Sequence, residues 1–110
     1  MIVIRNGPRR AFSVIEGLRL AAAMLGMDSP LLIVFLDEGV QCLRKGIFED
    51  PVMNGYLQAS SDLAEITALS DSLEEHGLGG DELNPGLEVK PIGLDELTEM
   101  MAGCRSVAAF

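Results

Sequence analysis

The chain has 110 residues, of which 48% are apolar and 23% are charged, and its formal net charge is −9. This composition is typical of a globular protein and excludes a disordered one, so we expect a single domain over residues 1–110. The acidic balance argues against nucleic acid as a direct ligand, because phosphate binding requires a concentrated basic surface. No apolar run is long enough to span a membrane and the first residues are too few for a signal-peptide core, so we expect a cytoplasmic protein with no membrane partner.

Short apolar runs alternate with helical stretches along the chain, which predicts an α/β fold with a mostly parallel sheet of about five strands between two helix layers. Strands are expected at 1–4, 31–36, 63–69, 87–92 and 105–110. Helices are expected at 13–25, 39–45, 71–76 and 95–102, with a single helical turn at 81–83. Ser13 and Ser70 are predicted to cap helices, and Pro91, which lacks an N–H, places the fourth strand at an edge of the sheet.

Residues 47–61 contain a proline, an asparagine and a glycine and have no clear period, so we expect a long loop with at most one helical turn near 56–59. An apolar cluster in this loop predicts an interface between subunits. Its members are Ile47, Phe48, Val52, Met53, Tyr56 and Leu57.

An unbroken apolar run over residues 31–36 is the clearest signal, and it stops at Asp37, Glu38 and Gly39. The run predicts a strand buried on both faces, and the residues after it lie at the carboxyl end of that strand, where α/β proteins gather ligands. Asp37, Glu38 and Gly39 are candidates for binding, although the simpler interpretation is that Asp37 caps a short helix and Gly39 adopts a backbone angle that other residues avoid.

Arg9 and Arg10 follow the first predicted strand and open on the same edge of the sheet, so they are candidates for holding an anion, or else solvated surface. His76 is expected at the end of a helix on the surface. The chain has no glycine fingerprint for a dinucleotide and no metal-ligand spacing, so we expect neither a cofactor nor a metal.

The order of residues resembles the DsrE/DsrF/DsrH-like family, and within it the DsrF/TusC branch. The resemblance rests on the turn 37–40, the segment 43–46 after it, the first-helix segment 14–18, the segment 71–78 and the final residues 106–110. It implies a three-layer α/β/α domain with strand order 4-3-2-1-5 that forms trimers or hexamers, alone or with other subunits of the family. Some members carry sulfur as a persulfide, in tRNA thiolation or in dissimilatory sulfur oxidation.

Family members that carry sulfur place a cysteine at the end of the third strand, whereas residues 65–70 here contain none. The two cysteines of the chain are Cys42, next to the functional edge, and Cys104, at the opposite edge. Cys42 is a candidate nucleophile, but its apolar neighbours favour a buried thiol.

Three hypotheses follow: a non-catalytic or assembly subunit in sulfur-relay or sulfur-oxidation chemistry, a persulfide carrier that uses Cys42, and a module that binds a small ligand or anion through Arg9, Arg10 and the loop 47–61.

Overall fold

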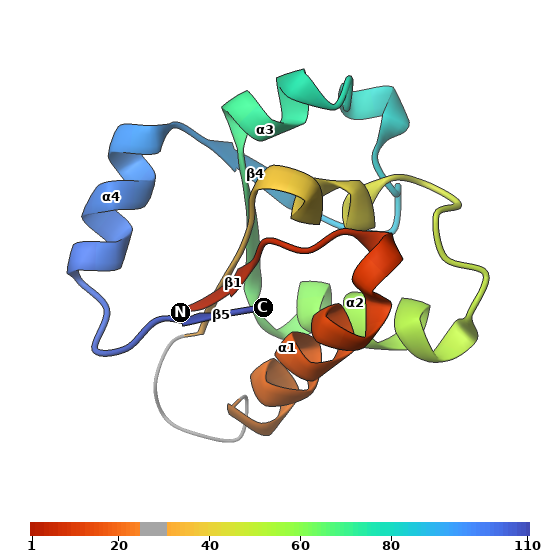
Figure 1. The fold of residues 1–110 in the computed structure, drawn as a ribbon, viewed down its shortest axis with the longest axis horizontal. Helices are drawn as coiled ribbons and strands as arrows, with labels where there is room; N and C mark the ends of the chain where they lie inside the picture. The colour runs from red at the N-terminus through yellow and green to blue at the C-terminus, as the bar shows by residue number, and fades with distance from the viewer. Residues whose placement is uncertain (25–30) are drawn as a thin grey trace.

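A computed structural model of the chain describes residues 1–24 and 31–110, and within them it contains a five-stranded sheet with helices on both faces (Figure 1). The strand order is β4-β3-β2-β1-β5 and every neighbouring pair is parallel, so the α/β class and the predicted order 4-3-2-1-5 are confirmed. The strands are β1 Ile2–Ile4, β2 Leu32–Phe35, β3 Glu65–Leu69, β4 Val89–Ile92 and β5 Ala108–Ala109. β4 lies at an edge, as Pro91 predicted.

Alternating residues of the strands face two separate cores. In the register of β1 with β2, Ile2 pairs with Ile33 and Val3 pairs with Val34. Ile2 and Ile33 belong to the larger core, whereas Val3 and Val34 belong to the smaller core on the opposite face of the sheet. Both faces of the central strands are therefore buried, as the apolar run predicted.

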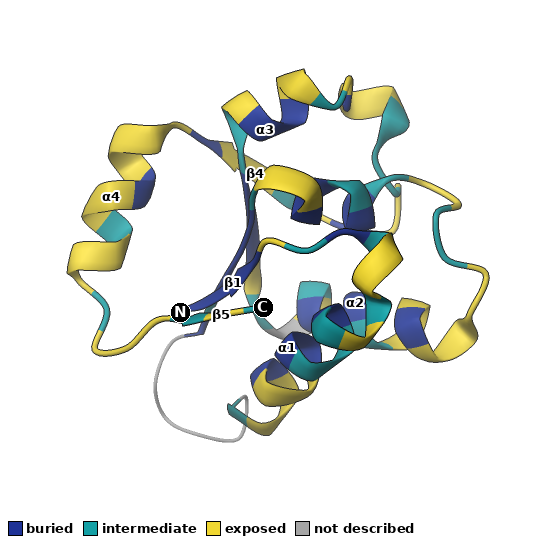
Figure 2. Ribbon diagram, in the orientation of Figure 1, coloured by how far each residue is buried: buried dark blue, intermediate teal, exposed yellow. Residues whose placement is uncertain are grey.

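The helices divide unequally between the two faces. α1 and α2 supply most helical side chains of the larger core, and α4 supplies a buried side chain, Leu97, to the smaller one. Figure 2 shows α4 exposed over most of its length. The helices are α1 Ala11–Met24, α2 Pro51–Leu63, α3 Ser70–Glu75 and α4 Leu94–Ala102, and the 3-10 helices are η1 Pro8–Arg10, η2 Asp37–Leu43 and η3 Gly80–Glu82.

The prediction of a loop over residues 47–61 is wrong, because α2 occupies most of that stretch. The helix begins at Pro51, and the side chain of Asp50 accepts a hydrogen bond of 2.9 Å from the amide of Val52. Met53 and Leu57, four residues apart, are buried against the larger core. Burial of this face outweighs the cost of about 1 kcal/mol that a glycine such as Gly55 imposes inside a helix.

The predicted apolar interface in this stretch is largely core. Met53 and Leu57 are buried, and Phe48 and Tyr56 pack partly buried against the same cluster, whereas Val52 is exposed. Met53, Tyr56 and Leu57 recur at three- and four-residue spacing, which places them on one face of the helix, against the core.

The two predicted serine caps are also wrong. α1 begins at Ala11, directly after η1, so Ser13 lies inside the helix. Ser70 is the first residue of α3, and the N-cap residue is Leu69, without a side-chain hydrogen bond. The predicted end of the first helix at residues 25–26 lies outside the described residues, and the last strand is confined to Ala108–Ala109.

Candidate functional site

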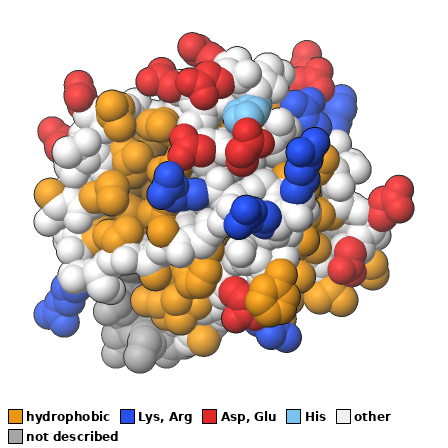
Figure 3. Space-filling view, in the orientation of Figure 1, with side chains coloured by type: hydrophobic (Ala, Val, Ile, Leu, Met, Phe, Trp, Pro, Cys, Tyr) orange, Lys and Arg blue, Asp and Glu red, His pale blue; other side chains and the backbone are white. Residues whose placement is uncertain are grey.

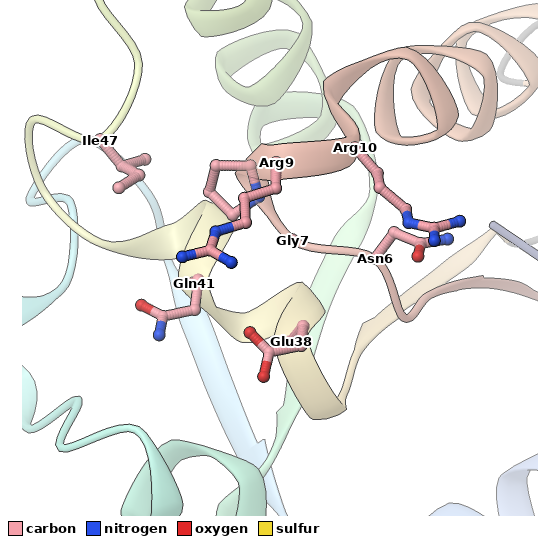
Figure 4. A pocket seen from close by; sticks show the side chains of 8 residues that line it. Asn6, Gly7, Arg9, Arg10, Glu38, Gln41 and Ile47 are labelled. Carbon is pink, nitrogen blue, oxygen red and sulfur yellow. The ribbon is translucent and has the colours of Figure 1, made fainter.

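The candidate site lies at the carboxyl edge of the sheet, where β1 leads into η1 and β2 leads into η2. Arg9 and Arg10 belong to η1, and Asp37, Glu38 and Gly39 begin η2. Between the two 3-10 helices is a cavity of about 590 Å³ (Figure 4). Its lining consists of Asn6, Gly7, Pro8, Arg9, Arg10, Glu38, Gln41 and Ile47. Three of the predicted binding residues, Arg9, Arg10 and Glu38, are thus brought together, while Asp37 and Gly39 lie outside the lining.

Two glycines allow the backbones of the two segments to touch. A Cβ atom on Gly39 would collide with the carbonyl oxygen of Ile4 at the end of β1. A Cβ atom on Gly7 would lie 2.9 Å from the carbonyl oxygen of Glu38. The close approach of the two segments beside the cavity therefore depends on two positions that have no side chain.

Neither predicted role of Asp37 or of Gly39 is found in the structure. The N-cap residue of η2 is Leu36, and Asp37 itself has a φ of +52°, in the left-handed region. Aspartate tolerates this region better than most residues, and here its amide donates a 2.9 Å hydrogen bond to the Oγ of the buried Ser72. Gly39 has no positive φ and is required by the close approach to Ile4 instead.

Asp37 and Glu38 point to different partners. The carboxylate of Asp37 lies 3.5 Å from the Nε of Arg5, in an exposed pair, and that of Glu38 lies 3.8 Å from the Nε2 of His76. No group of three metal-ligating side chains occurs among the residues that the structure describes. The two carboxylates therefore serve as separate contacts rather than as one acid–base pair.

A polar network holds one wall of the cavity in place. The side-chain amide of Gln41 lies 3.0 Å from the Nδ1 of His76, and its oxygen accepts a 3.2 Å hydrogen bond from the Nε of Arg44. Arg44 also donates a 3.0 Å hydrogen bond to the carbonyl oxygen of His76. His76 lies at the C-terminal end of α3, but its side chain is only 17% exposed, whereas a surface position was expected.

The sequence does not predict Gln41 as a cavity residue. Gln41 and His76 are 35 positions apart in the chain, and no periodicity or motif connects them. Ile47 lies in the lining and belongs to the segment 47–61, which the ligand-binding hypothesis includes.

Cys42 is buried, with a relative exposure of 1%, and its thiol faces the carbonyl oxygen of Asn6 at 3.7 Å. Burial raises the pKa of Cys42 from 9.0 to about 12. A thiol becomes nucleophilic as its thiolate, so this environment suppresses reactivity.

Cys104 follows α4 at the opposite edge of the sheet. It is partly exposed and donates a 3.1 Å hydrogen bond from its Sγ to the carbonyl oxygen of Met100. The position after β3, where the resemblance predicts a cysteine in sulfur carriers, is filled by Leu69 and Ser70. None of the described helices has the length and apolar character needed to cross a membrane.

Comparison with known proteins agrees with this architecture. A model of the DsrE/DsrF-like family matches residues 1–110. The structure is similar to that of the ychN protein from E. coli, with a TM-score of 0.74 and 21% identity over 99% of this chain and 97% of that chain. It is also similar to MTH1491 from Methanobacterium thermoautotrophicum, a protein of unknown function, with a TM-score of 0.70 and 19% identity over 99% and 97% of the two chains. A search among curated protein sequences finds no match to the chain.

Proposed function

Because the chain belongs to the DsrE/DsrF-like family, we propose that it is a cytoplasmic, non-catalytic subunit that supports sulfur-relay or sulfur-oxidation chemistry by assembly. The observation that carries the proposal is the state of its thiols. The position after β3 has no cysteine, and the cysteine nearest the functional edge, Cys42, is buried with a pKa of about 12.

A persulfide carrier needs a thiolate that can attack a sulfur donor and then present the bound sulfur to an acceptor. Cys42 meets neither requirement, since its thiol is protonated near neutral pH and enclosed by the core. The hydroxyl of Ser70 does not replace it, because an oxygen nucleophile forms no persulfide. These two facts favour a subunit that positions partners over one that carries sulfur itself.

The smaller core supports the assembly role. Among the described residues, α4 is the only helix that contributes a buried side chain on that face of the sheet, and Leu32, Leu36 and Leu69 are partly buried there. Leu94 and Val107 are 59% and 42% exposed. Figure 3 shows hydrophobic side chains gathered on the left of the molecule, the side on which α4 lies in Figure 1. An exposed apolar area of this kind is typical of a subunit interface.

We expect the purified chain to form a homo-oligomer of three or six copies through this face. The glutamate variants Leu94→Glu and Val107→Glu should dissociate it, because a carboxylate buried in an apolar interface without a partner is costly. Multi-angle light scattering at micromolar concentration measures the mass against that of the 11.8 kDa chain.

Val52→Glu is the matched control, since Val52 is 58% exposed but lies on α2, which packs on the opposite face of the sheet. A monomeric wild-type chain, or dissociation by Val52→Glu alone, would contradict the proposed interface.

A further inference from the structure

Basic residues are concentrated at the carboxyl edge of the sheet, although the chain as a whole is acidic. Five of the eight lysines and arginines lie in the segments that follow β1 or β2. They are Arg5, Arg9, Arg10, Arg44 and Lys45. Figure 3 shows both basic and acidic side chains around the histidine on this face. Acidic side chains such as Asp37, Glu38 and Glu82 lie at the same edge, so the attraction for an anion depends on the arginines that line the cavity rather than on the edge as a whole.

Arg9 and Arg10 differ from the other arginines of this edge. Arg5 pairs with Asp37 at 3.5 Å and Arg44 pairs with Glu82 at 3.7 Å. Within the described part of the chain, Arg9 and Arg10 form no ion pair. Both nevertheless line the cavity, and Glu38 is the one carboxylate in the same lining.

We propose that the cavity between η1 and η2 binds a small phosphate monoester, with Arg9 and Arg10 holding the phosphoryl group. Guanidinium groups present paired N–H donors that match phosphoryl oxygens, which makes arginine the residue suited to this contact. In Figure 4 the guanidinium of Arg9 points toward Gln41 and Glu38, and that of Arg10 lies beside the side chain of Asn6. The amides of Asn6 and Gln41 add neutral donors to the same lining.

The remaining lining explains why an ester is favoured over bare phosphate. A volume of about 590 Å³ is that of a small-molecule site and leaves most of its space empty around an oxyanion alone. Ile47 supplies an apolar surface for an organic group, and the carboxylate of Glu38 can accept a hydrogen bond from a hydroxyl on it. One carboxylate against two guanidinium groups leaves the lining positive overall.

The cavity is also built in advance of any ligand. Gly7 allows η1 to lie against the backbone of Glu38, and Gln41 is fixed between Arg44 and His76. The amide of Arg10 donates a 2.9 Å hydrogen bond to the carbonyl oxygen of Gly7, which fixes the turn that carries both arginines. In a preformed site, little of the binding free energy is lost in ordering the protein's own groups.

The test is a titration of the 15N-labelled protein with phenyl phosphate and with inorganic phosphate at constant ionic strength, followed by amide chemical shifts. We expect saturable shifts confined to residues 6–10 and 38–47, with phenyl phosphate bound several-fold more tightly than phosphate. Arg9→Ala and Arg10→Ala should each weaken binding by about tenfold or more, the usual effect of losing a charged hydrogen bond.

Two further variants make the result specific. Arg105→Ala removes the same charge from a residue before β5, at the opposite edge, and should change affinity by less than about twofold, as expected for screened surface charges. Glu38→Gln removes the negative charge from the lining and should strengthen binding. Shifts that do not saturate, or an equal loss in Arg105→Ala, would overturn the proposal. The proposed phosphate-monoester site does not depend on the proposed assembly function, because the cavity lies within one chain.

Discussion

Replacing Gly39 by alanine is expected to lower the free energy of unfolding by about 3 kcal/mol or more, the upper range for overpacking a buried site. A Cβ atom there would collide with the carbonyl oxygen of Ile4, which is backbone and cannot rotate away. That oxygen also accepts a 3.1 Å hydrogen bond from the amide of Leu36, and the amide of Gly39 donates one of 2.9 Å to the carbonyl of Leu36. Relief of the collision therefore breaks contacts that join β1 to η2.

Gly55→Ala is the matched control, because Gly55 lies inside α2 and a Cβ atom on it would meet nothing within 4 Å. This variant should stabilise the protein by about 0.4–1 kcal/mol, through a less flexible unfolded chain and a better helix former. Urea unfolding of both variants provides the measurement. If the free energy of unfolding of Gly39→Ala were within about 0.5 kcal/mol of the wild-type value, the close approach of η2 to β1 would not constrain the site.

Cys42 is expected to react with iodoacetamide about a thousandfold more slowly in the native protein than in the unfolded protein. Burial raises the pKa of Cys42 from 9.0 to about 12. The thiolate fraction near neutral pH falls about tenfold for each unit by which the pKa rises. Enclosure in the core slows the reaction further, because the reagent reaches the sulfur only after local opening.

The measurement uses Cys104→Ala, so that alkylation reports on Cys42 alone, and compares rates in buffer and in urea at the same pH. The matched variant Cys42→Ala shows the reactivity of the partly exposed Cys104 in the native state. Native labelling of Cys42 as rapid as that in urea would show that its thiol is accessible, and the carrier hypothesis would regain its main support.

The sheet could be predicted from sequence because its signals are local. The apolar run over residues 31–36 predicted burial on both faces, and β2 indeed lies in the middle of the sheet. Pro91 lacks a backbone donor, so the strand that contains it had to lie at an edge. The helix α2 was missed since Pro51, Asn54 and Gly55 read as loop residues, and only packing of Met53 and Leu57 against distant strands shows otherwise.

The candidate site was predictable in position but not in detail. Arg9, Arg10 and Glu38 all follow parallel strands, and the carboxyl ends of such strands meet at one edge. The observed roles of Asp37 and Gly39 could not be foreseen, because they depend on Ser72, 35 residues after Asp37, and on the carbonyl of Ile4. The position of Gln41 between Arg44 and His76 likewise depends on a contact across 35 residues.

The claim that this chain does not itself carry sulfur is tested most directly by its mass after incubation with a persulfide donor. The account predicts that the intact native protein gains no adduct of one sulfur atom, about 32 Da, on Cys42, since that thiol is buried and protonated. An adduct of that mass that persists in Cys104→Ser and vanishes in Cys42→Ser would contradict the account and assign persulfide transfer to Cys42.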